Sequence, residues 1–133
     1  MKEYIKLSEK LEILKKQIEI LQEDINLYLY KTKKDKIKSL LEHSCLYFGT
    51  TIDEIKERNR KPEICEVRNI IANYLRDNFK LSLKRIGLEI GNRDHSTVLN
   101  MLSNHQNDTD VYEDYRQKYK DYCEFIESRL NGN

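Results

Sequence analysis

Apolar residues near the start of the chain recur at alternating steps of four and three, the spacing of a heptad seam. The seam consists of Leu7, Leu11, Leu14, Ile18, Leu21, Ile25 and Tyr28. Leucine at d with isoleucine at most a positions favours a parallel two-stranded coil. The flanking charges are mixed: parallel pairing sets Lys10 against Lys15, whereas antiparallel pairing can set Lys10 against Asp24. The pattern predicts a long amphipathic helix over residues 1–36.

A second apolar stripe widens the face of this helix. Ile13, Ile20 and Leu27 recur every seven residues at the c positions of the same heptads. Such a wide face can cover a second copy of the helix or fold back onto the chain's own core. We favour a homodimer formed through the helix, and intramolecular packing is the alternative.

Beyond the lysine-rich joint at residues 31–36, the spacing changes to that of short amphipathic helices separated by turn residues. The expected helices cover residues 37–48, 52–58, 62–78, 83–90, 94–103 and 112–130, with a polar loop at 105–110. Gly49 and Pro62 stand where helices commonly end and begin. Because no segment alternates like a strand, we expect an all-α fold.

Composition and charge restrict the function. The chain has 133 residues, of which 35% are charged, and a net charge of +1. This length suits one compact domain, residues 37–133, with the helix 1–36 as an appendage. Residues 1–38 carry a net charge of +3 and residues 106–133 carry −3. Any nucleic-acid surface must therefore be a local basic stripe.

Several classes of site are not expected. No run approaches the roughly 18 apolar residues of a membrane span, and a charged helix opens the chain in place of a leader. Three cysteines without CxxC spacing fit a reducing cytoplasm. His43, His95 and His105 lie at unrelated spacings, so we expect no metal, cofactor or catalytic set, and a small hydrolase is the weakest alternative.

Two short expected helices joined at Gly91 have the order and lengths typical of a helix-turn-helix. Gly87, without a side chain, would let them approach closely. The stretch Gly91-Asn92-Arg93-Asp94-His95-Ser96-Thr97-Val98-Leu99 closely resembles the signature of the DNA-binding domain of the bacterial replication initiator DnaA. Residues 48–55, 58–64 and 82–87 resemble further blocks of that family, so the likeness covers about residues 37–105. No GxxxxGK[ST] phosphate loop occurs, so the ATPase module of DnaA has no counterpart among these residues.

The first turn of the second short helix carries the candidate base contacts. Asp94, His95, Ser96 and Thr97 lie where a recognition helix meets base edges in the major groove. An Asp accepts from a cytosine amino group, and a Thr offers its methyl group to thymine. The alternatives are an N-cap role for Asp94 and a buried structural role for His95. The run of polar residues favours contact with DNA.

Basic residues supply the candidate positive surface. They are Arg60, Lys61, Arg68, Arg76, Lys84 and Arg93. The resemblance implies that Arg60 reaches into the minor groove, and that Arg68, Arg76 and Lys84 grip phosphates or base edges. Arg68 and Arg76 lie eight residues apart, from which we expect them to share one helix face. A solvated surface charge is the alternative for any one of them.

The predicted function is sequence-specific binding of double-stranded DNA at DnaA-box-like sites by a bacterial, phage or mobile-element protein. It would regulate replication initiation or transcription without ATPase activity. The alternative is an adaptor, whose long helix recruits a replication or transcription partner to DNA.

Overall fold

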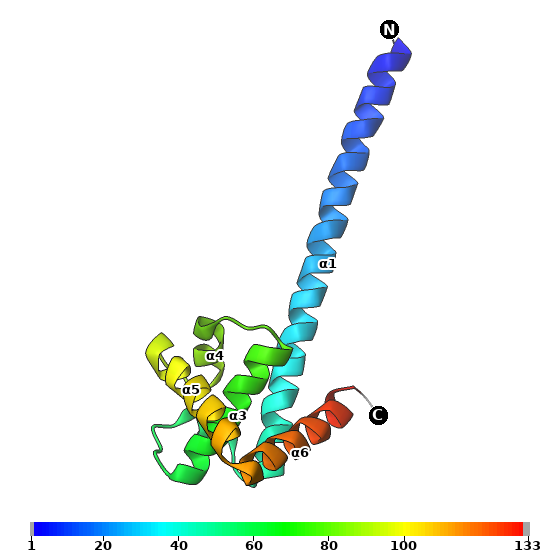
Figure 1. The fold of residues 1–133 in the computed structure, drawn as a ribbon. Helices are drawn as coiled ribbons and strands as arrows, with labels where there is room; N and C mark the ends of the chain where they lie inside the picture. Colours follow the sequence, from blue (N-terminus) through cyan, green and yellow to red (C-terminus); the bar gives the residue numbers. More distant parts are fainter. Residues whose placement is uncertain (1, 132–133) are drawn as a thin grey trace. The chain divides into compact units, whose positions relative to one another are not determined.

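The computed structural model describes residues 2–131, with side chains from residue 6 onward. The helices are α1 (Lys2–Phe48), α2 (Ile52–Lys56), α3 (Pro62–Asn78), α4 (Leu83–Glu89), α5 (His95–Val111) and α6 (Glu113–Leu130) (Figure 1). No strand occurs among residues 2–131, and the expected all-α fold is confirmed. Over the same residues, no helix combines the length and apolar character needed to cross a membrane.

The chain divides into two compact units, Met1–Lys36 and Ile37–Asn133. The described part of the first unit is helical throughout. Its seven seam residues are between 52% and 68% exposed, and the second stripe is exposed to the same degree. Within the first unit, the seam and the second stripe are therefore both exposed apolar rows.

The joint expected at residues 31–36 does not break the helix, because α1 continues through it to Phe48, but the division between the two units falls at its end, after Lys36. Lysines, a threonine and an aspartate fill this segment, and none of them breaks a helix as Gly or Pro does. The change from an exposed to a buried face begins at Ile37, within the same helix.

The second unit is built around α3, which contacts α2, α4 and α5, and α5 also contacts α4 and α6. Isoleucine, leucine and valine from these helices form one buried cluster. Tyr122 of α6 is fully buried, and its hydroxyl lies 2.7 Å from the Ser44 hydroxyl of α1. Tyr115 is also buried, so tyrosines of α6 serve packing, although Tyr112 at the start of the helix is exposed.

The polar loop expected at residues 105–110 is also wrong, because α5 extends to Val111. His105 is buried, whereas Gln106, Asn107 and Asp110 after it are exposed, and the Gln106 amide donates to the Asp110 carboxylate at 2.9 Å. The helix ends where Tyr112 adopts an extended conformation. Polarity alone therefore did not identify a loop, since one turn of a surface helix is equally polar.

Candidate nucleic-acid interface

A tight turn joins α4 to α5 and lets the two helices lie close together. The hydroxyl of Ser82 caps α4. Gly91 and Asn92 adopt positive φ angles of 102° and 56° in the turn. A Cβ atom on Gly87 would lie 2.1 Å from the carbonyl oxygen of Arg93, so only glycine permits this approach. The prediction made for Gly87 is confirmed.

The first turn of α5 presents polar side chains. Asp94 is the N-cap, and its carboxylate accepts a hydrogen bond from the backbone N–H of Thr97 at 2.8 Å. Hydrogen bonding from Thr97, first of all from this N–H, lowers the pKa of the Asp94 carboxyl, which is ionised at neutral pH. His95 and Ser96 are exposed, and Thr97 is half-buried. Although the Asp94 carboxylate caps the helix, Asp94 remains exposed to solvent beside His95 and Ser96.

A basic loop connects α2 to α3. Arg58, Arg60 and Lys61 of this loop are exposed. The side chain of Asn59 accepts a hydrogen bond from the backbone N–H of Lys61 at 2.9 Å, which shapes the loop. Pro62 begins α3, as expected from its fixed φ.

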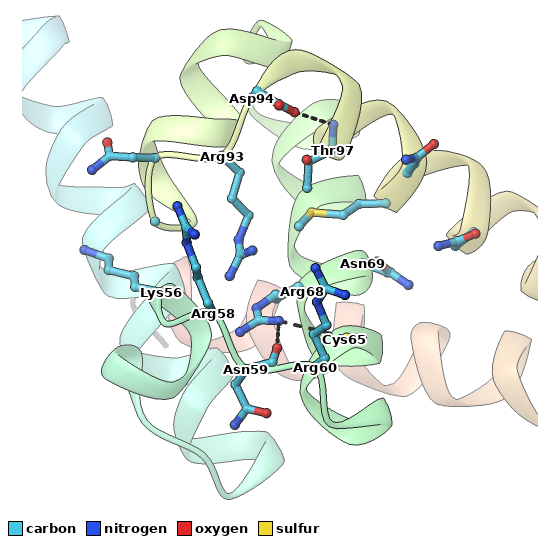
Figure 2. Close-up of a pocket in the computed structure, with 15 residues that line it drawn as sticks. Lys56, Arg58, Asn59, Arg60, Cys65, Arg68, Asn69, Arg93, Asp94 and Thr97 are labelled. Carbon is cyan, nitrogen blue, oxygen red and sulfur yellow. Dashed lines mark hydrogen bonds between the residues drawn. The ribbon is translucent and has the colours of Figure 1, made fainter.

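A hollow lies between the basic loop and α5 (Figure 2). Arg58 and Arg60 line it from the loop, and Thr97, Asn100 and Asn104 line it from α5. Steps of three and four along α5 place these three polar residues on one helix face. Sequence reasoning missed Arg58, Asn100 and Asn104. Their spacing from Thr97 was the available signal for the two asparagines.

Arg68 lies beneath this hollow and is only 3% exposed. Its Nε donates to the carbonyl of Ile55 at 2.8 Å. One terminal nitrogen donates to the carbonyls of Glu54 at 3.0 Å and Glu57 at 2.7 Å, and the other to that of Asn59. The burial and these four carbonyl partners are at odds with the expected grip on phosphate or base edges. Arg68 instead satisfies the backbone at the carboxyl end of α2.

Arg93 reaches two of the same carbonyls from the turn before α5, and Figure 2 shows its side chain directed toward Arg68. One terminal nitrogen donates to Ile55 at 3.2 Å and to Glu57 at 2.7 Å. Burial, and after it the charge of Arg68, lowers the pKa of Arg93. Both arginines thus place positive charge at the negative end of a helix, and Arg93 fastens the turn to α2.

Arg76 and Lys84 are exposed, and neither lines the hollow. Arg76 donates to the carbonyl of Leu81 at 3.0 Å, which holds it near the start of α4. Arg68 and Arg76 do not share an exposed face, contrary to expectation. Eight residues of helix leave two side chains about 80° apart, which is enough to bury one and expose the other.

The three histidines occupy different environments. His105 is buried, with Nδ1 2.6 Å from the Tyr115 hydroxyl and its ring edge-on to Tyr119. Burial lowers the pKa of His105, which favours the neutral ring. His43 is half-buried, and His95 is exposed. Within the described chain, no group of three or more His, Cys, Asp or Glu side chains lies close enough to hold a metal ion.

A short helix and a longer one joined at a tight glycine turn, with a capped polar first turn on the second helix and a basic loop beside it, define a helix-turn-helix DNA-binding domain.

The family follows from sequence comparison. The profile of the family described as bacterial dnaA protein helix-turn-helix matches residues 37–104, and the chain belongs to this family. The chain is 33% identical over 98 residues to the chromosomal replication initiator protein DnaA of Chlorobaculum tepidum, covering 74% of this chain and 20% of that protein. It is 32% identical over 94 residues to that of Clavibacter sepedonicus, covering 71% of this chain and 19% of that protein.

A third relative, the DnaA protein of Bacteroides thetaiotaomicron, is 39% identical over 70 residues, which are 52% of this chain and 15% of that protein. The chain thus spans about a fifth or less of the length of these relatives. No significant match was found among solved structures.

Proposed function

We propose that this chain binds double-stranded DNA sequence-specifically at DnaA-box-like sites, and that it regulates replication initiation or transcription by occupying them. The observation that carries the proposal is the exposed first turn of α5, with Asp94, His95 and Ser96 in solvent beside a basic hollow. The 133-residue sequence contains no GxxxxGK[ST] phosphate-binding loop. The proposed role therefore depends on DNA binding and needs no ATP hydrolysis by this sequence.

In this proposal, the first turn of α5 enters the major groove. The Asp94 carboxylate accepts from a cytosine amino group while it caps the helix. His95 and Ser96 donate or accept at neighbouring base edges, and the methyl group of Thr97 meets thymine.

The basic loop reaches the adjacent minor groove, where arginine reads a narrow width. A DNA strand then crosses the hollow between the loop and α5. Arg58 and Arg60 neutralise its phosphates from one side, and the amides of Asn100 and Asn104 donate to them from the other. Further phosphate contacts come from Lys61 on the loop, Arg76 in the last turn of α3 and Lys84 on α4. Arg68 and Arg93 act indirectly, by holding the loop and the turn together.

Fluorescence anisotropy tests this proposal directly. A labelled duplex carrying one DnaA-type box (TTATCCACA) is titrated at fixed near-physiological salt against a scrambled duplex of equal composition. A preference of about a hundredfold or more for the box is expected. Equal, salt-sensitive binding to both duplexes would contradict box recognition, and absence of binding would contradict the function.

Replacing His95 tests the reading of bases by α5. His95→Ala should weaken binding to the box by about fivefold to a hundredfold, while binding to the scrambled duplex stays nearly unchanged, because a base contact is lost. The same anisotropy titration measures both values. His43→Ala, a half-buried histidine outside the interface, is the matched control. Equal loss on both duplexes would show that His95 contacts the backbone instead of a base.

We also propose that the N-terminal helix joins two copies of the chain. Its exposed seam is the surface that a second helix buries, at about 25 cal/mol for each Å² of apolar area. A dimer can hold two boxes at once, so the second contact becomes intramolecular. Avidity then exceeds the affinity of one domain by a factor of about 100 to 10,000.

Two serines placed in the seam should separate the copies. Leu14→Ser with Leu21→Ser is expected to convert a dimer to a monomer in sedimentation velocity, and to abolish the gain in affinity for a duplex with two boxes. Glu12→Ser with Glu19→Ser, on the polar side of the same helix, is the matched control. An unsubstituted chain that is already monomeric would reject the dimer and favour the adaptor, with the helix recruiting another protein.

A further inference from the structure

The apolar face of the N-terminal helix contains a row of polar side chains within it. Going around the helix, heptad positions c, g, d and a follow one another at steps of about 50°. The c stripe, Ile13, Ile20 and Leu27, is 57%, 58% and 68% exposed. The g positions between this stripe and the seam hold Lys10, Gln17 and Asp24. A partner helix that covers the face must therefore match these side chains.

We propose that a second copy of the chain covers this face in the antiparallel orientation, with the pair centred near Lys16. The inference rests on the dimer proposed above and adds its orientation and register. In this register Leu7 packs against Ile25 of the second copy, Leu11 against Leu21, and Leu14 against Ile18. Each of these layers is then apolar, and g positions face g positions.

Charge in the g row selects this arrangement. Lys10 of each copy meets Asp24 of the other, so the pair contains this ion pair twice, and Gln17 meets Gln17. A parallel pair instead sets Lys10 against Lys15 of the other copy, also twice. The antiparallel pair has one like-charge contact, between the two copies of Lys15, on the opposite edge. The balance of attraction and repulsion therefore favours antiparallel pairing, against the preference of the a and d residues for a parallel coil.

The antiparallel orientation also brings the second stripes of both copies to the same side of the interface. In an antiparallel pair, both g rows lie on one side of the interface, so both c stripes flank that side. The six apolar side chains of the two stripes then border a neutralised polar row. A parallel pair would place the two stripes on opposite sides, each beside an unmatched lysine.

Antiparallel pairing also determines the distance between the points where the two N-terminal units end. Lys36 lies twenty residues beyond Lys16, so the two copies of Lys36 are about 60 Å apart along the helix axis. Adjacent half-sites of helix-turn-helix dimers lie only about 34 Å apart. In this pair the two DNA-binding units therefore begin farther apart than the half-sites of one compact palindrome.

A charge reversal at Lys10 distinguishes the two orientations, because it should weaken an antiparallel dimer and strengthen a parallel one. Lys10→Asp sets like charges together in the antiparallel pair but creates an attraction to Lys15 in the parallel one. We expect the dimer dissociation constant of the full chain to rise about three- to tenfold at low salt, and Lys10→Asp with Asp24→Lys to restore it. Lys16→Asp, at an outward position, is the control. A tighter dimer in Lys10→Asp would overturn the proposal.

Cysteine cross-linking tests the register without depending on charge. Leu7→Cys mixed with Ile25→Cys should form a disulfide-linked dimer, whereas Leu7→Cys alone should not. A parallel pair would cross-link Leu7→Cys with itself and overturn the proposal. The unsubstituted chain, oxidised alongside, accounts for the native cysteines. Absence of self-association would reject the dimer itself. The preference for the box is measured on a duplex with one site, so it tests the proposed DNA binding separately from the dimer.

Discussion

Arg68→Ala should lower the stability of the folded protein, even in the absence of DNA. Removing the side chain leaves the carbonyls of Glu54 and Asn59 without this donor, and takes one of two donors from Ile55 and Glu57. A carbonyl left without a donor away from water costs about 1–3 kcal/mol, the residues Glu54 and Asn59 are only half-buried, and Arg93 compensates for part of the loss. We therefore expect the free energy of unfolding to fall by about 3 kcal/mol. Urea denaturation followed by circular dichroism measures it.

Two further variants make this test specific. Arg68→Lys should be intermediate, because one ammonium group cannot reach four carbonyls with the planar geometry of a guanidinium. Arg58→Ala removes an exposed arginine from the adjoining loop and should change stability by less than about 0.5 kcal/mol. If Arg68→Ala kept its stability but bound DNA more weakly with a lower salt slope, Arg68 would be a phosphate contact, as the resemblance implied.

Much of the fold was predictable from local pattern. Apolar spacing identified the helices that pack in the second unit, and Gly87 and Gly91 identified the turn between α4 and α5. The predicted ends of helices were wrong where a polar segment was interpreted as a loop. The segment at 105–110 is an exposed helical turn anchored by buried His105, and only the aromatic side chains of α6 that cover this histidine reveal it.

The candidate site was predictable in its exposed part. A run of small polar residues after a turn, at 94–97, indicates a recognition helix, and the exposure of His95 and Ser96 agrees with that prediction. The role of Arg68 was not predictable, since a charged residue on a helix gives no local sign that it lies beneath another element. Its partners are backbone carbonyls, which sequence does not distinguish.

Gly87→Ala should destabilise the domain and displace the recognition helix together. The new Cβ atom would lie 2.1 Å from the carbonyl oxygen of Arg93, a backbone atom that cannot rotate away. The same turn is tied by a hydrogen bond from the N–H of Arg93 to the carbonyl of Gly87 at 3.0 Å. Separating α4 from α5 is the way to relieve the clash, and we expect a loss of about 3 kcal/mol in the free energy of unfolding.

The same displacement moves the first turn of α5, so box preference should fall even in the folded fraction, measured by anisotropy well below the urea midpoint. Gly49→Ala separates this steric effect from the general cost of replacing glycine. Gly49 has a φ of 71° but no atom within 4 Å of a Cβ, so its substitution carries only backbone strain. That strain costs about 1 kcal/mol and should leave box preference intact. Equal losses in the two variants would mean that the contact at Gly87 does not position α5.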